Sequence, residues 1–145
     1  QKAVSAILEG SFDHIRVNLA NGDMVGHTGD LAATIDAVQC VDDCVGQLMK
    51  AVRTAGGVLL VTADHGNADQ MYGIDKKTKA YTQSPHTSHT LNPVPFYVFA
   101  PSHNVNLNTP SGPQVTGSIA QVGGSLLDLF SVELPDDYLP SLIQT

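Results

Sequence analysis

The stretch Val58-Leu59-Leu60-Val61-Thr62 is an apolar run that passes directly into Ala63-Asp64-His65-Gly66-Asn67. A short strand that is apolar on both faces is typical of a parallel sheet covered by helices. Side chains that can bind metals follow this strand at once, and open α/β sheets bind ligands beyond the carboxyl ends of their strands. The stretch therefore predicts an α/β layer with its functional residues at strand ends.

The segments around this strand complete the layer. Apolar residues at steps of three and four, with Gly and Pro at the boundaries, separate helices from strands. Helices are expected over residues 2–8, 31–52 and 119–130, strands over 13–19 and 94–100, a turn at 21–23, an exposed loop or hairpin at 75–84 and a loop at 101–117. Alternating strands and helices predict the α/β class.

Composition excludes two classes of protein. The chain has 145 residues and a net charge of −7, without a basic stripe, so no nucleic-acid partner is expected. Its longest apolar run is too short for a bilayer, so no membrane partner is expected. Charged residues are only 14% of the chain, which suggests a surface that something else covers. Cys40 and Cys44 lie on one helical face, where a disulfide is not favoured, and free thiols fit a cytoplasmic location.

Aspartate and histidine are concentrated in three short motifs. These are Asp23-Met24-Val25-Gly26-His27, Asp64-His65-Gly66-Asn67 and His86-Thr87-Ser88-His89-Thr90. Their oxygen and nitrogen donors suit manganese, zinc or cobalt. They exceed one tetrahedral site and are closer to a pair of metals, which stabilise the attacking and leaving oxygens of phosphoryl transfer.

Each motif also has a structural interpretation. An Asp-x-x-x-His pair arises often by chance, Asp64 could cap a helix, and His86 and His89 could be loop residues. Their joint occurrence after strands favours the functional interpretation. His14 and His103 stand outside the motifs and are expected to be structural.

The motifs, with their flanks, resemble those of the cofactor-independent phosphoglycerate mutases, members of the alkaline phosphatase superfamily. The matching segments are residues 17–29, 62–69, 86–96 and 137–142, in the family's order. The resemblance implies a partial alkaline-phosphatase-like domain of the α/β class. Its sheet would be mostly parallel and flanked by helices, with metal ligands at strand ends.

The resemblance also implies a chemistry. Such enzymes are isomerases of glycolysis that interconvert 3-phosphoglycerate and 2-phosphoglycerate through a phosphoserine intermediate, with two divalent metal ions. Manganese is the ion expected, with zinc or cobalt as alternatives. By resemblance, Asp23, His27 and His89 hold one metal, and Asp64 and His65 hold the other. His86 receives no ligand role.

Several parts of the family's machinery have no match in these residues. The family's nucleophilic serine, a further metal-binding aspartate and an arginine-bearing substrate domain all lie upstream of the motifs. Residues 1–145 are therefore expected to be the C-terminal portion of a metal-binding phosphatase-like domain, inactive by themselves and partnered by the missing N-terminal portion. The segment Gly73 to Ser84 is longer and more basic than expected for the family.

Two alternatives remain open. One is another superfamily member, such as a phosphopentomutase or a phosphatase, against which the run Asn92-Pro93-Val94-Pro95-Phe96 argues. The other is a noncatalytic domain that binds only a metal or a partner. A serine-bearing metal motif upstream of Gln1 would favour the mutase.

Overall fold

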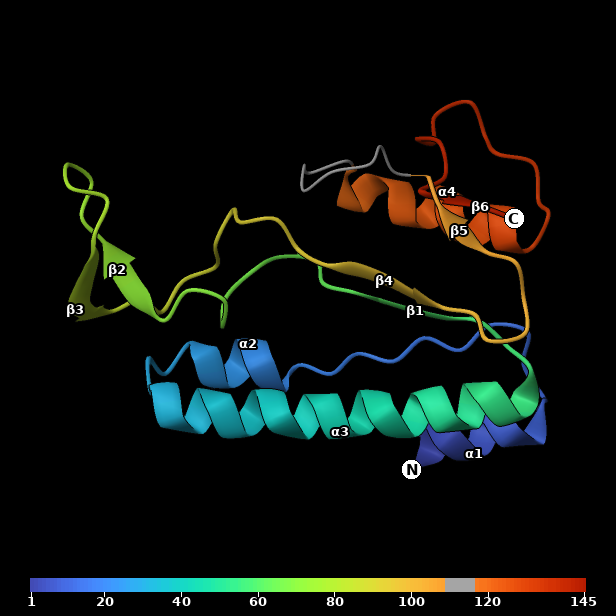
Figure 1. Cartoon of the computed structure of the whole chain (residues 1–145), viewed down its shortest axis with the longest axis horizontal. Coiled ribbons are helices and arrows are strands. Elements are labelled where there is room, and N and C mark those ends of the chain that lie inside the picture. Colours follow the sequence, from blue (N-terminus) through green and yellow to red (C-terminus); the bar gives the residue numbers. More distant parts are fainter. Residues whose placement is uncertain (109–116) are drawn as a thin grey trace.

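The computed structural model describes residues 1–108 and 117–145 (Figure 1). Its helices are α1 (Lys2–Glu9), α2 (Asn21–Gly26), α3 (Leu31–Ala55) and α4 (Val122–Leu129), with a 3-10 turn, η1 (Ile119–Gln121). Its strands are β1 (Leu59–Thr62), β2 (Tyr72–Ile74), β3 (Tyr81–Pro85), β4 (Phe96–Phe99), β5 (Asn106–Leu107) and β6 (Ile143–Gln144). The predicted mixture of helices and strands is confirmed.

The long helix α3 is the platform on which α1 and α2 pack (Figure 1). It begins after Asp30, whose side chain accepts a hydrogen bond from the Ala33 backbone N–H at 3.0 Å. It ends at Gly56, which adopts a left-handed φ of 71° that glycine tolerates best. Its start matches the predicted helix over residues 31–52, and it continues to Ala55, because the helix runs on until the left-handed Gly56.

The prediction of a mostly parallel sheet is wrong for the described residues, in which every strand pair is antiparallel. β1 pairs with β4 in the register Leu59↔Phe99 and Thr62↔Phe96. For β4 to run parallel to β1, the chain would have to cross back to the end of the sheet at which β1 begins. Residues 63–95 instead reverse the chain at the end of β1, so that β4 runs back beside it.

Two shorter segments also differ from expectation. Residues 13–19, predicted as a strand, pair with no strand in the described ranges. Residues 21–23, predicted as a turn, begin helix α2, because the backbone N–H of Met24 bonds to the carbonyl of Ala20 and opens a helical turn.

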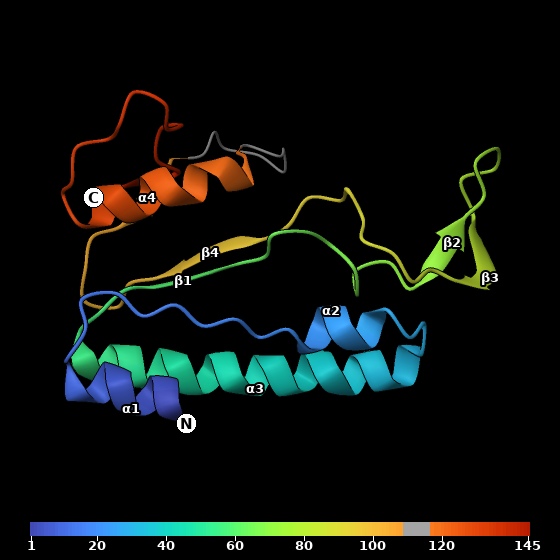
Figure 2. The same cartoon turned by 180° about the vertical axis from the view of Figure 1, so that it is seen from behind.

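The remaining predictions of elements are confirmed where the structure describes them. β2 and β3 form the exposed hairpin, and η1 with α4 occupies the predicted C-terminal helix. The predicted loop at 101–117 contains the short strand β5, and its residues 109–116 lie outside the described ranges. The hairpin projects at one end of the molecule and α4 lies toward the other (Figures 1 and 2).

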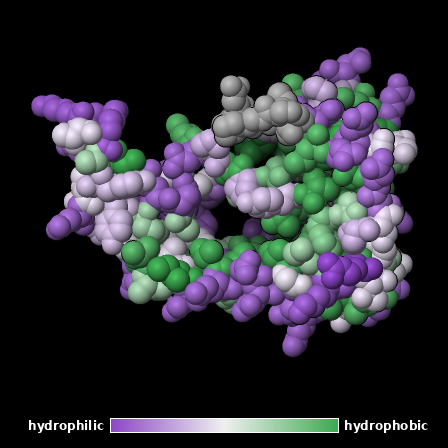
Figure 3. Space-filling model, in the orientation of Figure 1, coloured by the Kyte–Doolittle hydropathy of each residue, from purple (hydrophilic) through white to green (hydrophobic). Residues whose placement is uncertain are grey.

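Apolar side chains remain on the surface in large number. α3 exposes Leu31, Ile35 and Val38, which share a face of the helix by their spacing. Figure 3 shows apolar surface open to solvent on the inner side of the hollow between the upper and lower parts of the molecule. Within the described ranges, no helix combines the length and apolarity needed to cross a membrane.

Candidate metal centre

Helix α2 and the residue that caps its C-terminus carry the first two predicted ligands on one face. Asp23 and His27 are four residues apart, and His27 Nε2 lies 3.2 Å from Asp23 Oδ1. The other ring nitrogen of His27, Nδ1, lies 2.7 Å from the carbonyl oxygen of Thr87. A carbonyl only accepts, so Nδ1 is the donor in this contact, and the ring is held with Nε2 toward Asp23. This turn of the chain therefore holds the two side chains close enough to bind one cation together.

The antiparallel pairing of β1 and β4 brings the other two histidines together. His65 follows the end of β1 and His89 precedes β4, so both lie at the same end of this strand pair. The backbone N–H of Thr90 donates to the carbonyl of Gly66 at 2.9 Å, which joins the two segments next to the histidines. The two imidazoles stack with ring centroids 3.6 Å apart.

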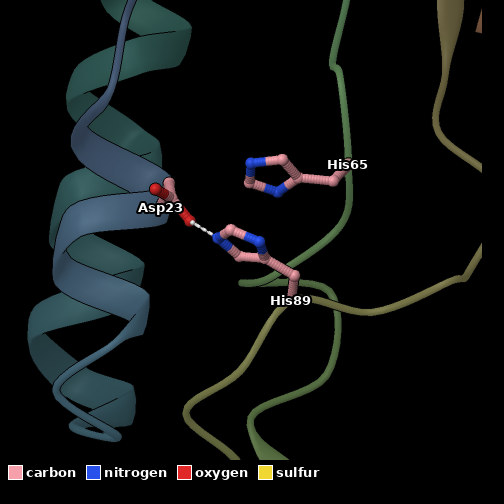
Figure 4. Close-up of side chains that lie close together, drawn as sticks. All are labelled: Asp23, His65 and His89. Atoms are coloured by element: carbon pink, nitrogen blue, oxygen red, sulfur yellow. Dashed lines mark ion pairs between the residues drawn. The ribbon is translucent and has the colours of Figure 1, made fainter.

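Asp23, His65 and His89 converge from three separate segments (Figure 4). One ligand atom of each lies within 4.8 Å of those of the other two, and His89 Nε2 is 3.1 Å from Asp23 Oδ1. Ligands about 2.0–2.2 Å from one ion lie roughly 3–4 Å from each other, so small side-chain movements would complete the coordination. The donor set of one carboxylate and two imidazoles suits a divalent transition metal. The residues present therefore fit a metal ion.

Asn67 fixes the carboxylate of Asp23. Its Nδ2 donates to Asp23 Oδ1 at 2.7 Å and to the Asp23 carbonyl at 3.3 Å, and the residue is buried. This hydrogen bond is the largest influence on the pKa of Asp23 and lowers it; burial, the next largest, raises it, and His27, His89 and His65 each lower it by less. The carboxylate is thus held in its charged form, which is the form that binds metal.

The structure places Asp64 at the margin of the cluster. Its side chain is 89% exposed, and its Oδ1 lies 3.7 Å from His65 Nε2. The family resemblance implied a different metal for His65 than for Asp23 and His89, whereas the structure gathers these three together. The division of ligands between two metals stays a prediction.

The structure also adds residues that the motifs alone did not single out. Asn67 orients Asp23, and the Thr87 carbonyl orients His27. Both residues lie inside the quoted motifs, so their polar groups next to the predicted ligands could have identified them from the sequence. His86, which received no ligand role, donates its backbone N–H to Met71, and its Nδ1 is buried without a hydrogen-bond partner among the described residues.

Comparison with known proteins gives consistent results. A model of the metalloenzyme superfamily matches residues 1–134. The chain is 46% identical over 145 residues to a probable 2,3-bisphosphoglycerate-independent phosphoglycerate mutase of Leptospira interrogans, covering 96% of this chain and 26% of that protein. It is 42% identical over 153 residues to the 2,3-bisphosphoglycerate-independent phosphoglycerate mutase of Nicotiana tabacum, covering 99% of this chain and 26% of that protein.

A solved structure agrees in fold. It is a Leishmania mexicana phosphoglycerate mutase, determined at low cobalt concentration, with a TM-score of 0.90 and 40% identity. The match covers 99% of this chain and 27% of that one. The resemblance drawn from the motifs and the partial phosphatase-like fold are confirmed, and the chain spans about a quarter of the length of these relatives.

Proposed function

The chain belongs to the metalloenzyme superfamily, and on that premise we propose that it forms the metal-binding part of a phosphoglycerate mutase. The enzyme would interconvert 3-phosphoglycerate and 2-phosphoglycerate as a step of glycolysis, in the cytoplasm. The names of the relatives support this substrate, and free Cys40 and Cys44 fit a reducing compartment.

The convergence of Asp23, His65 and His89 is the observation that carries the proposal. In the fully loaded site, Asp23, His27 and His89 would hold one divalent cation, and Asp64 and His65 would contribute to a second. Manganese is the proposed ion, with zinc or cobalt as alternatives. Bound cations would supply positive charge that neutralises phosphoryl oxygens as the group is transferred.

The chain's own residues would prepare that site. Asn67 would keep Asp23 charged and aimed at the cation, and the Thr87 carbonyl would hold His27 with Nε2 toward it. The nucleophilic serine and the arginines that bind the substrate would come from residues outside this chain. The 145 residues alone are therefore proposed to be inactive.

Turnover of 3-phosphoglycerate, measured in a coupled assay with added manganese, tests the proposal. The 145-residue chain should show no conversion. A fusion of this chain to the upstream portion of the Leptospira interrogans relative should convert the substrate in a manganese-dependent manner, because the two parts would complete one site.

A matched pair of variants in the fusion separates the metal site from general folding. His89→Ala should abolish conversion, and His103→Ala should retain it, because His103 contacts the Gly56 carbonyl far from the cluster. Conversion by the chain alone would refute the requirement for another portion. An inactive, folded fusion that binds manganese would favour the noncatalytic alternative.

A further inference from the structure

Asp69 joins the two loops that carry His65 and His89. Thr90 Oγ1 donates to Asp69 and lies 3.2 Å from Oδ1 and 3.1 Å from Oδ2. Asn92 Nδ2 donates to Asp69 Oδ2 at 2.6 Å, the shortest of these contacts. We refer to Asp69, Thr90 and Asn92 together as the Asp69 clamp. The clamp connects the segment after β1 to the segment before β4.

The clamp lies beside the two histidines in the chain. His65 and His89 are the immediate neighbours of Gly66 and Thr90, which are themselves joined by the backbone hydrogen bond of 2.9 Å. The segments also approach closely here, because a Cβ on Gly66 would collide with Thr90 Oγ1 and with the Asp69 carboxylate. A change at Asp69 would therefore alter the separation of the two loops at the point where the imidazoles stack.

Asp69 itself stands outside the group that can hold a metal. That group consists of Asp23, His65 and His89, and the Asp69 carboxylate is already occupied by side-chain donors from the opposite loop. We propose that Asp69 is a positioning residue that sets the spacing of His65 and His89, and through it the affinity for a divalent cation. This inference rests on the metal site of the proposed function.

Exchanging Asp69 and Asn92 tests this role, because the double variant should restore what the single variant loses. Asp69→Asn leaves an acceptor oxygen for Asn92 but removes its charge, so the short charge-assisted contact becomes a weaker one between two neutral amides. The double variant Asp69→Asn/Asn92→Asp restores one carboxylate and one amide, with the same total charge as the parent. Asp75→Asn is the matched control: Asp75 accepts from the Lys77 and Thr78 backbone N–H groups in the hairpin, away from the clamp.

Two readouts on the 145-residue chain separate this inference from the proposed function. The first is the nuclear Overhauser effect between the His65 and His89 rings in metal-free protein, which reports their spacing directly. The second is the affinity for Co²⁺, followed by its visible absorption. Asp69→Asn should lose the ring contact and bind Co²⁺ about 10- to 100-fold more weakly, and the double variant should recover both.

The outcomes are distinct. If Asp69→Asn keeps the ring contact and the affinity of the parent, or if the double variant recovers neither, the positioning role is overturned while the metal site stands. If Asp75→Asn weakens Co²⁺ binding equally, the effect is a general loss of charge and the positioning role is again overturned. If the parent binds no Co²⁺ yet Asp69→Asn alone separates the rings, the proposed metal site fails, and Asp69 keeps its role in ring spacing but not its role in cation affinity.

Discussion

Replacing Asn67 by alanine is expected to weaken divalent-metal binding by removing the group that orients Asp23. Asn67 Nδ2 lies 2.7 Å from Asp23 Oδ1, a short hydrogen bond to a charged acceptor. Such a bond contributes about 1.5–3 kcal/mol, which corresponds to roughly a 10- to 150-fold change in an equilibrium constant. We expect a loss of metal affinity within that range, because Asp23 would remain present but free to rotate.

The same substitution should raise the pKa of Asp23 in metal-free protein. The hydrogen bond from Asn67 is the largest influence that holds this pKa below its usual value, so its removal shifts the pKa upward. A depressed pKa in the folded state stabilises the protein above the unfolded pKa, and that contribution is lost as the pH falls through the folded pKa. Protonation of Asp23 at low pH should therefore lower the free energy of unfolding of Asn67→Ala by less than it lowers that of the parent.

Titration with Co²⁺ measures the affinity, and carboxylate carbon shifts measured by NMR give the pKa. Asn104→Ala, at an exposed position distant in sequence from the cluster, is the control and should leave both quantities unchanged. An Asn67→Ala protein that folds, binds Co²⁺ as tightly as the parent and keeps the low pKa of Asp23 would show that Asn67 does not orient or charge Asp23.

Three further predictions concern other parts of the chain. His89→Ala should lose bound metal after dialysis against a mild chelator while His86→Ala retains it, because only His89 faces Asp23; metal analysis giving the reverse order would contradict the assignment. Asp30→Ala should lower the free energy of unfolding by about 1 kcal/mol through loss of the α3 cap, as measured by urea denaturation, and no change relative to the exposed Asp36→Ala control would count against that cap. The pKa of Asp75 should lie below its usual value because Thr78 and Lys77 donate to it, so NMR should show the hairpin tip losing these hydrogen bonds as the pH falls through that pKa; an ordinary pKa would contradict this.

The sequence predicted the features that depend on local chemistry. Gly56 marked the end of α3, because a glycine in the left-handed conformation stops a helix locally, whereas the cap at Asp30 is seen only in the structure. The apolar run at residues 58–62 marked β1, because a short continuous apolar run indicates a strand by its local pattern. The ligand types in the three motifs were also readable, because the residue identities themselves fix the donor atoms.

Features that depend on long-range pairing were not predicted. The direction of β4 relative to β1 depends on where residues 63–95 reverse, and an apolar strand has the same pattern in either direction. The grouping of His65 with Asp23 and His89 follows from that reversal, so the sequence could not provide it. The hydrogen bonds that Asn67 donates and that Asp69 accepts likewise join segments 20 or more residues apart in the sequence.

The most direct test of the account is the position of a bound cation in a crystal of the Co²⁺-soaked chain, located by anomalous scattering. In this chain alone, without the residues that would complete a two-cation site, we expect one shared cation with a peak about 2.0–2.2 Å from a carboxylate oxygen of Asp23 and from one ring nitrogen each of His65 and His89. Saturating Co²⁺ with no peak at these three residues, or with a peak only elsewhere on the molecule, would contradict it.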